Sequence, residues 1–532
     1  IDPRRTETAR IAEEHVFIEP GTDVFFYLSF LNEVLKNKGV NPERTEAFMK
    51  GFEEVKEICA EWTAERTAKV TGIEPEVLRS LVRAYLEADG ASLYSSTGVN
   101  MGGQGALAFW IQEVINAVSG NLDRKGGTLV GRGIMDFLKF GVKKGLLIKD
   151  SKSRIGGFGM VNDAFPGGIL ADEILTPGEG QIRGMFITGG NPLITMAESE
   201  KLKTAFEKLD LLVCLDIFQN ETCSVADYVL PCTDPFQRPD LPFIFPLMLG
   251  LQTRPYLQAT EAMVPPQGEQ RDEAGIYIAL AKSSGFPLWG SGVAQKFFEG
   301  LMRMNRLDNG QPTVPQKSML STLLRLCRQP GFKKLLKRDH GWLREGHKEN
   351  DFLGKRVYTG DKKVDLAPKD LLEASKRLED AFEKELNRGK GFKMITKRAV
   401  QTHNSWTHNT DRMLKGSEGT NFLYMHPRDA EKLDLGHGDL ADVSSSYAKV
   451  RIPVKVLPEQ KRGTVAIPHG WGHQGAKGLG IACKTKGVNV NLLAGSGQDQ
   501  IDPLSGMSKL TALEVSIERA EGEQAPNWSG IS

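Results

Sequence analysis

The chain has 532 residues, of which 40% are hydrophobic and 25% are charged, so it is long enough for several globular domains. Its 68 lysine and arginine residues are balanced by 67 aspartate and glutamate residues, which excludes a global attraction to nucleic acid or to an anionic membrane. No window approaches the ~18 uninterrupted apolar residues that a spanning helix needs, so the sequence predicts no membrane span.

The six cysteines form no C-x-x-C motif, and three of them lie in or beside apolar segments between residues 211 and 232. This pattern predicts buried thiols in a reduced protein, instead of a disulfide framework or a zinc site, and a cytoplasmic location is the expectation. The chain begins IDPRRTETAR, without an initiator methionine or an apolar leader. We therefore expect a targeting signal to be absent from this fragment and not necessarily from the gene product.

Two turn phrases, Asp2-Pro3-Arg4 and Pro20-Gly21-Thr22-Asp23, come first in the chain. Arg4 and the arginine after it fit a solvated surface pair, and the second phrase fits a helix N-cap before VFFYLSFLNEVL. A capped N-terminus can also receive a polar ligand, so both roles stay open for the second phrase. Apolar spacing over residues 24–90 predicts a helical scaffold.

A glycine-rich segment follows, ASLYSSTGVNMGGQGALAFWIQEVINAV, with glycines at 98, 102, 103 and 105. These glycines fall between a predicted strand and a predicted amphipathic helix, which is the context of a phosphate-binding loop. The segment has neither Gly-Lys-Ser/Thr nor an in-frame G-x-G-x-x-G. The pattern alone therefore does not identify a nucleotide site.

Short apolar runs at 185–188, 211–215 and 228–230 are bounded by turn residues and predict parallel strands that are covered on both faces. The first run ends in Gly189-Gly190-Asn191-Pro192 and the second in Asp216, so backbone amides and a carboxylate should meet at the carboxyl ends of the strands. Open α/β sheets bind nucleotides at that edge. Taken alone, these residues also fit a strand-end turn and a solvated carboxylate.

The remainder of the chain divides into two patterns. From about 285 to 390 it is charged and helical with proline and glycine breaks, and its basic helical faces are interpreted as solvated surface. From about 391 to 520 short strands alternate with turn clusters, which predicts a small β-barrel.

Four histidines in this last segment, His403, His408, His469 and His473, invite a metal-site interpretation. The neighbouring prolines and glycines exclude a helical H-x-x-x-H pair, and H-E-x-x-H is absent. Contacts to a cofactor, or hydrogen bonds within the fold, are the favoured interpretation.

Several of these phrases, in order, resemble the molybdopterin oxidoreductases, the dimethyl sulfoxide reductase family that includes formate dehydrogenases and nitrate reductases. The resemblance is carried by GMFITGGNP, by LDLLVCLDIFQNETCSVADYVLP and by KRAVQTHNSWTHN. It implies an α/β fold of doubly wound parallel-sheet domains with a C-terminal β-barrel of the double-psi type. It also implies a partial α/β core at 1–284, a helical insertion at 285–390 and a dinucleotide-binding barrel domain at 391–532.

The resemblance further implies a set of contacts to molybdopterin guanine dinucleotide. These are Asp2, Arg4, Arg5, Gly21, Thr22, Asp23, Thr97, Gly98, Gly189, Gly190, Asn191, Asp216, Arg238, Asp272, Arg398, His403, Asn404, Ser405, Asn409, His469 and Asn491. Hydroxyl and amide groups suit phosphate oxygens and pterin nitrogens. Arg132 matches the family's VRG-like turn, where a guanidinium near the metal pairs with a small anion, and is the expected catalytic residue. The phrase after it, IMDFLKFGVKKG, departs from formate-type members.

The implied cofactor is bis-molybdopterin guanine dinucleotide with molybdenum or tungsten. Family members carry upstream the cysteines of a four-iron four-sulfur cluster and a metal-ligating residue, which we do not find in this chain, so we expect the fragment to be inactive alone. The implied function is a two-electron redox reaction on a small-molecule substrate, with an electron-transfer subunit or redox protein as partner. The alternative is a non-catalytic electron-transfer or structural subunit with the same fold and no molybdenum.

Overall fold

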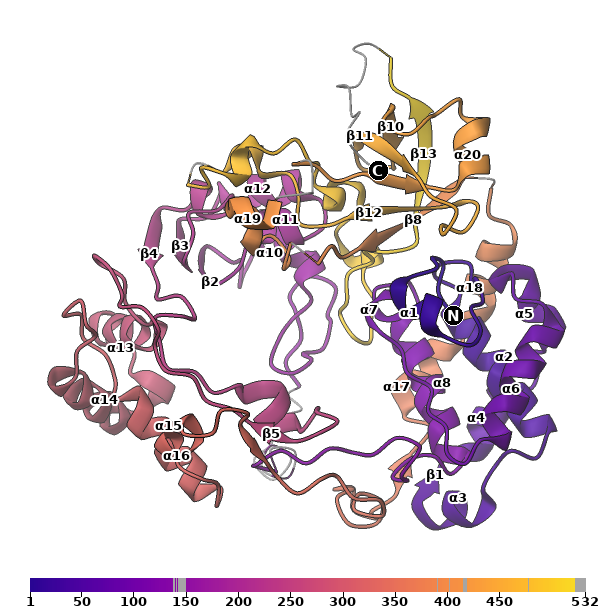
Figure 1. Cartoon of the computed structure of the whole chain (residues 1–532), viewed down its shortest axis with the longest axis horizontal. Helices are drawn as coiled ribbons and strands as arrows, with labels where there is room; N and C mark the ends of the chain where they lie inside the picture. The colour runs from indigo at the N-terminus through magenta and orange to yellow at the C-terminus, as the bar shows by residue number, and fades with distance from the viewer. Residues whose placement is uncertain are drawn as a thin grey trace.

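The computed structural model describes residues 1–136, 139, 141, 150–389, 391–400, 402–414, 419–476 and 478–521, with the side chains of 243 and 246 left aside. Its elements form four groups, which are arranged in space as a ring: a helical body, a β-barrel, a small α/β lobe and a second helical lobe (Figure 1). Within the described part of the chain, no helix combines the length and the apolar character that crossing a membrane requires. Most of the phrase after Arg132 lies outside the described residues.

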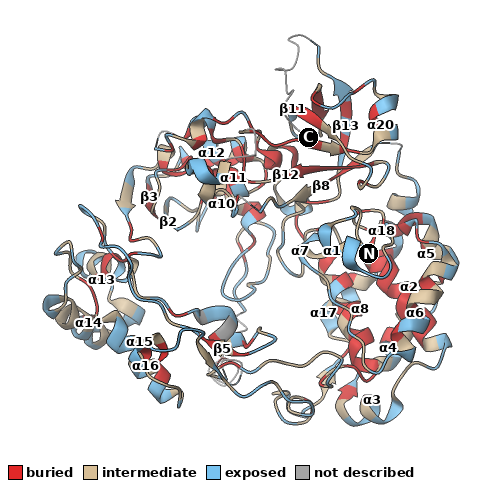
Figure 2. Cartoon of the chain, in the orientation of Figure 1, coloured by how far each residue is buried: buried red, intermediate tan, exposed pale blue. Residues whose placement is uncertain are grey.

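The helical body contains most of the first third of the chain. Its helices are α1 (Glu7–Ile11), α2 (Asp23–Lys36), α3 (Pro42–Phe48), α4 (Phe52–Cys59), α5 (Ala64–Thr71), α6 (Pro75–Glu87), α7 (Thr97–Asn100), α8 (Gly105–Val118), α17 (Lys369–Ser375) and α18 (Leu378–Leu386). Strand β1 (Met49–Lys50) pairs in parallel with β7 (Val364–Asp365). The helices α2 and α8 are apolar nearly all round and are buried along most of their length (Figure 2). The predicted helical scaffold is confirmed.

Helices from the far part of the sequence complete this body. Phe382 of α18 packs edge-on against Phe25 and Trp62, with ring centroids 5.4 Å apart in both pairs. Ala374 and Leu378 belong to the same buried cluster. The stretch after residue 285 therefore supplies part of the first core.

The strand predicted before Gly98 is absent, because the described residues 91–96 form no strand and pair with none. Asparagines of the neighbouring helix and turn take the place of a strand partner. Asn121 Oδ1 accepts from the Ala91 amide at 3.1 Å, and Asn116 bonds both the amide and the carbonyl of Leu93 at 2.9 Å. Side-chain hydrogen bonds of this kind leave no periodic signal in the sequence.

The α/β lobe contains the predicted three-stranded parallel sheet in the order β2-β3-β4. Its strands are β2 (Gly184–Thr188), β3 (Leu211–Asp216) and β4 (Tyr228–Pro231), and its helices are α10 (Leu170–Leu175), α11 (Pro192–Thr195) and α12 (Ser199–Phe206). The apolar cluster under α10 and α12 covers one face of the sheet.

The opposite face of this sheet is only partly covered, which corrects the expectation for these strands. Helix α13 (Glu273–Ser284) packs Ile276 against Leu215 and Leu230, at the carboxyl ends of the strands. Farther toward the amino ends of the strands, Val213 of β3 pairs with Phe186 of β2 on one side and with Tyr228 of β4 on the other. Phe186 is 47% exposed and Tyr228 is 62% exposed. The apolar run of β2 therefore does not mean burial on both sides.

The second helical lobe consists of α13, α14 (Gly292–Met304), α15 (Gln316–Leu326), α16 (Phe332–Leu336) and the π-helical segment Phe243–Leu249. Strands β5 (Tyr256–Leu257) and β6 (Trp342–Leu343) pair antiparallel beside it. Single-turn 3-10 segments lie at Gly167–Ile169, Cys223–Val225, Leu288–Gly290, Trp406–Asn409, His473–Gly475, Ala482–Lys484, Val490–Leu493 and Gln498–Gln500.

The predicted C-terminal barrel is confirmed as a closed mixed barrel in the order β10-β11-β9-β12-β8-β13. Its strands are β8 (Phe392–Lys397), β9 (Leu423–Met425), β10 (Leu440–Ser444), β11 (Lys449–Val456), β12 (Thr464–Pro468) and β13 (Leu513–Arg519), with helices α19 (Asp411–Leu414) and α20 (Pro427–Lys432) between them. Inward side chains alternate along the strands and fill the interior. The parallel pair β8 and β12 ends at the side that faces the α/β lobe.

Candidate functional site

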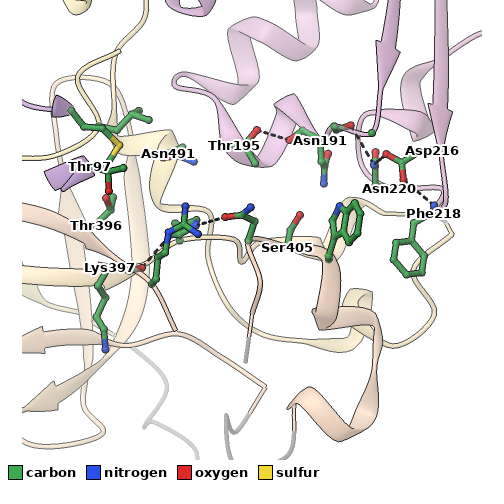
Figure 3. Close-up of a pocket in the computed structure, with 18 of the residues that line it drawn as sticks. Thr97, Asn191, Thr195, Asp216, Phe218, Asn220, Thr396, Lys397, Ser405 and Asn491 are labelled. Carbon is green, nitrogen blue, oxygen red and sulfur yellow. Dashed lines mark hydrogen bonds between the residues drawn. The ribbon is translucent and has the colours of Figure 1, made fainter. Parts of the chain in front are cut away.

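A cavity of about 550 Å³ lies where the α/β lobe, the barrel and the α7 turn meet. Predicted site residues from distant parts of the sequence line it together: Thr97, Gly98, Gly189, Gly190, Asn191, Asp216, Arg398, Asn404, Ser405, His469 and Asn491. Asn191, Asp216 and Asn220 lie on one side, with Thr396, Lys397 and Ser405 on the other (Figure 3). We call this space the first cavity.

The sheet side of the first cavity is built from strand ends. Gly189 follows β2 with φ +58°, and a β-carbon built there meets nothing within 4 Å, so its backbone is open to the cavity. Asp216 ends β3 and accepts from the Phe218 amide at 3.0 Å and from Asn220 Nδ2 at 3.1 Å. Burial raises the pKa of Asp216 above its usual value. An acidic group is thus held beside a glycine turn, in which the Gly189 amide itself donates to the Leu215 carbonyl at 2.8 Å.

The barrel side is built from two turns that lie in contact. Gly470 has φ +88°, and a β-carbon at this position would overlap the Asn404 carbonyl oxygen, so only glycine allows the approach. His469 shares hydrogen bonds with the Lys397 carbonyl at 3.2 Å and with Asn404 Oδ1 at 3.3 Å. The turns PHGWGH at 468–473 and THNSWTHN at 402–409 therefore have a steric reason to lie in contact.

A second cavity of about 730 Å³ adjoins the first and shares Gly98, Thr396, Lys397 and Arg398 with it. Its lining contains the predicted residues Asp2, Arg4, Gly21 and Asp23, with aromatic side chains of Phe26, Tyr27, Phe30, Tyr85 and Tyr94. The two predicted turn phrases at the start of the chain therefore meet in space. The strand end of β8 separates this second cavity from the first.

Burial also shifts the pKa values of charged groups around the second cavity. Burial raises the pKa of Asp23 to about 6, and it lowers the pKa of Lys397 to about 8, with Arg4 acting in the same direction on Lys397. The Lys397 ammonium lies 4.1 Å from the centroid of the Tyr424 ring. An anion bound in either cavity would favour the charged form of Lys397 and so oppose this lowering of its pKa.

Seven predicted residues line neither cavity. Arg5, Thr22, Arg132, Arg238, Asp272, His403 and Asn409 form this group. Thr22 occupies the N-cap position of α2, but its hydroxyl donates to the Glu19 carbonyl at 2.7 Å and does not cap the helix. Asp272 caps α13, and Asn409 accepts from two backbone amides of the Ile481 turn. Their side chains are used within the fold.

The four remaining members are charged or aromatic and lie on the surface or in surface ion pairs, and Arg5 is exposed. Arg132, the expected catalytic residue, is exposed and pairs with Asp351 at 3.1 Å. Arg238 pairs with Glu273, also at 3.1 Å. His403 packs its ring 6.0 Å from that of Trp406, which does line the first cavity. The roles assigned to these side chains remain predictions.

Sequence reasoning missed several lining residues, chiefly Thr396, Lys397, Phe218, Asn220 and Trp406. Thr396 and Lys397 are the last residues of β8, and they pair with the end of β12 just before His469. A prediction of this strand pairing would have placed them beside His469. Asn220 lies four residues after Asp216 in the same polar loop, and its side-chain bond to Asp216 links the two.

Among the described residues, no group of three or more histidine, cysteine or acidic side chains could hold a metal ion. His408 and His473 are buried and bond each other through their ring nitrogens at 2.8 Å. The interpretation as hydrogen-bonded histidines is confirmed for this pair. Cysteines 59, 214, 223 and 232 are buried thiols, as expected, whereas Cys327 and Cys483 are partly exposed, which corrects the expectation for these two.

The chain matches two protein-family models, one for the part that contains the sheet side of the first cavity and one for the barrel. Residues 1–283 match the molybdopterin oxidoreductase family, and residues 392–513 match the molydopterin dinucleotide binding domain. Formate dehydrogenase H of Escherichia coli is 29% identical over 250 residues, which cover 44% of this chain and 34% of that protein. Trimethylamine-N-oxide reductase of Haemophilus influenzae is 22% identical over 521 residues, which cover 88% of this chain and 61% of that protein.

A further relative, the probable oxidoreductase YyaE of Bacillus subtilis, is 28% identical over 326 residues, or 60% of this chain and 46% of the relative. The chain thus spans less than two thirds of the length of these relatives. Acetylene hydratase from Pelobacter acetylenicus has the same fold, with a TM-score of 0.76 and 20% identity over 98% of this chain and 73% of that one. Since the family match alone covers residues 1–283, more than half of the sequence, this chain belongs to the molybdopterin oxidoreductase family.

Proposed function

We propose that the chain is the portion of a molybdenum- or tungsten-dependent oxidoreductase that binds bis-molybdopterin guanine dinucleotide, and that the complete protein performs two-electron redox chemistry on a small-molecule substrate. The division into a core at 1–284, an insertion at 285–390 and a barrel domain at 391–532 belongs to the same proposal. The observation that carries it is the pair of adjoining cavities, each with a glycine turn and an acidic side chain.

The donors and acceptors in the two cavities fit two copies of a guanine dinucleotide. The first cavity has the carboxylate of Asp216 for guanine or ribose donors, and the second has those of Asp2 and Asp23. Lys397 and Arg398 lie between the cavities and suit polyphosphate charge. Gly189 offers its open backbone for close approach to a phosphate.

The chain's own contribution would be to bind and orient. The glycine turn after β2 allows close backbone approach, and the ends of β8 and β12 supply the facing wall. When bound, the molybdopterin group supplies the metal-centred redox chemistry, and the protein tunes and positions it. Formate dehydrogenase H and trimethylamine-N-oxide reductase are relatives, so an electron-transfer partner is part of the proposal, whereas the substrate is left open.

The test uses GDP as a probe for the guanosine diphosphate end of the dinucleotide. Calorimetry on the whole chain should detect GDP binding, and Asp216→Asn should weaken it about tenfold, because a hydrogen bond to a charged acceptor contributes about 1.5 to 3 kcal/mol. Asp210→Asn, at the exposed amino end of the same strand, is the matched control and should bind as the wild type does.

A second test uses the complete protein in a host that cannot make molybdopterin. Its activity should be lost there, whereas unchanged activity would favour the cofactor-free electron-transfer or structural subunit. Purified alone, the present chain should contain neither an iron–sulfur cluster nor catalytically competent molybdenum. Elemental analysis that finds stoichiometric iron would contradict this part of the proposal.

A further inference from the structure

A buried chain of polar side chains links the glycine turn of the first cavity to the barrel. Asn191 Nδ2 donates to Glu221 Oε2 at 2.6 Å, Glu221 Oε1 lies 2.8 Å from His473 Nδ1, and His473 Nε2 lies 2.8 Å from His408 Nδ1. All four residues are at most 8% exposed. We call them the Asn-Glu-His-His relay.

The direction of the hydrogen bonds in the relay follows from Glu221. Burial raises the pKa of Glu221, but hydrogen bonds from His473 and Asn191 outweigh this and leave the pKa below its usual value. The carboxylate is therefore ionised and only accepts. His473 must then donate from Nδ1, and its Nε2 lone pair accepts from His408 Nδ1.

The end of the relay agrees with this direction. Burial lowers the pKa of His408 to about 4, so its ring is neutral at physiological pH and carries one proton. Within the described residues, His408 Nε2 has no partner at ordinary hydrogen-bond geometry, although the Gly470 backbone acts to raise the pKa of the ring. The ring packs 4.2 Å from that of Trp471. With the proton on Nδ1, His408 Nε2 is a bare lone pair. The reverse arrangement would bury an unsatisfied N–H, which costs more free energy than an unsatisfied acceptor.

The relay joins the two sides of the first cavity. Asn191 follows Gly189 and Gly190 directly, and its Oδ1 accepts from Thr222 Oγ1 at 2.9 Å, so the carboxamide is fixed at both ends. His408 lies in the turn that contains the lining residue Trp406, and His473 lies four residues after the lining residue His469. A change of hydrogen-bond direction anywhere in the relay would reach both sides.

We propose that His408 and His473 are positioning residues, which act through Glu221 to orient Asn191 and thereby hold the glycine turn against the barrel in a binding-competent form. This proposal rests on the proposed function only for the identity of the ligand. The histidines do not touch the cavity lining as catalytic groups would, and their effect is carried by the directed hydrogen bonds.

The decisive variant is Glu221→Gln, which keeps the shape of the side chain but replaces one acceptor with a donor. Asn191 Nδ2 is a donor, so the new amide has to turn its nitrogen toward His473 and its oxygen toward Asn191. His473 then has to accept through Nδ1, and the tautomers of both histidines reverse. Nitrogen-15 spectra of the whole chain, labelled at histidine, should report Nδ1–H for both residues in the wild type and Nε2–H for both in the variant.

Two further readouts tie the relay to the cavity. The amide resonances of Gly189 and Gly190 should shift in Glu221→Gln, and GDP affinity should fall about fivefold or more, which is the lower end of coupling between linked sites. Glu200→Gln, a change at an exposed glutamate of α12, is the matched control and should alter neither. If Glu221→Gln fails to fold, His408→Phe still tests the relay, because it removes the donor to His473 Nε2 and should move the same two glycine resonances.

Each outcome decides the matter. Nε2–H at His473 in the folded wild type, or unmoved glycine resonances in a folded variant with reversed tautomers, would overturn the positioning role. Failure of the wild type to bind GDP would count against the nucleotide site alone, since the tautomers and the glycine resonances are measured without ligand.

Discussion

The barrel and the three-stranded sheet form opposite sides of the first cavity, yet they are stabilised in different ways. The barrel closes on itself, and its core side chains Leu423, Ile452 and Val465 are fully buried. The sheet is open, and within the described residues β2 and β4 have no outer strand partner. Hydrophobic burial therefore fixes one side, whereas polar contacts such as the Asn-Glu-His-His relay position much of the other.

The two regions also treat carboxylates in opposite ways. Asp442 of β10 accepts two hydrogen bonds from Arg451, at 2.8 and 3.0 Å, and its pKa is lowered to about 2 mainly by that guanidinium. Asp216 at the end of β3 receives hydrogen bonds only from neutral groups among those described, and burial raises its pKa. The structural carboxylate is paired with a cation, and the cavity carboxylate is left available to a ligand.

The largest effect should come from Lys393, which joins the barrel to the helical body. Its side chain is 1% exposed, and its ammonium donates to the Pro20 carbonyl at 2.7 Å and to Glu385 at 2.6 Å. Lys393→Ala breaks this buried ion pair and leaves Glu385 only the more distant Arg388, whose Nε lies 3.8 Å away, so it should reduce the free energy of unfolding by about 3 to 5 kcal/mol. Urea unfolding measures this loss. Lys449→Ala, at an exposed barrel lysine, is the control, and equal loss in both variants would contradict the prediction.

A core substitution within the barrel should come next. Leu423 of β9 is fully buried between β11 and β12, so Leu423→Ala opens a cavity in a closed structure that has little room to collapse. We expect a loss of about 2 to 5 kcal/mol in the free energy of unfolding. Hydrogen exchange should show faster opening across the barrel strands while the sheet amides keep their rates. Faster exchange confined to the sheet would contradict the contrast.

The pH dependence of stability should have opposite signs in the two regions. The pKa of Asp442 is lowered, so its stabilisation is present above pH about 4 and is lost as the pH falls toward about 2. The pKa of Asp216 is raised, so its contribution is present below pH about 4 and is lost as the pH rises through the folded value.

Asn substitutions separate these two contributions. Asp442→Asn should lower stability at neutral pH and flatten the acid loss, whereas Asp216→Asn should flatten the decline above pH about 4. Added salt should weaken the first effect because Arg451 is half exposed. Unfolding curves at a series of pH values measure both contributions. The prediction would be wrong if the stabilisation from Asp442 and that from Asp216 changed with pH in the same direction.

The same contrast explains what the sequence could predict. The barrel strands and β2 to β4 were predictable because their apolar runs are bounded by turn residues, and the strand-end position of Gly189 and Asp216 followed from that. The relay was not predictable, since Glu221, His408 and His473 meet only through tertiary structure and carry no spacing signal. The segment before α7 was mistaken for a strand because its backbone is bonded to asparagine side chains instead of a neighbouring strand.

The smallest effect should be on the open face of the sheet, at Phe186. Adjacent residues of β2 point to opposite faces, so Phe186, 47% exposed, and Ile187, 9% exposed and packed in the cluster under α10 and α12, form a matched pair. Phe186→Ala should change the free energy of unfolding by no more than about 0.5 kcal/mol, as surface substitutions do. Ile187→Ala should cost about 2 to 5 kcal/mol, because it leaves a cavity in a packed cluster. Urea unfolding of the isolated chain compares the two directly. A loss at Phe186 as large as that at Ile187 would mean that both faces of the sheet are covered, and the contrast between the sheet and the barrel would then rest on closure alone.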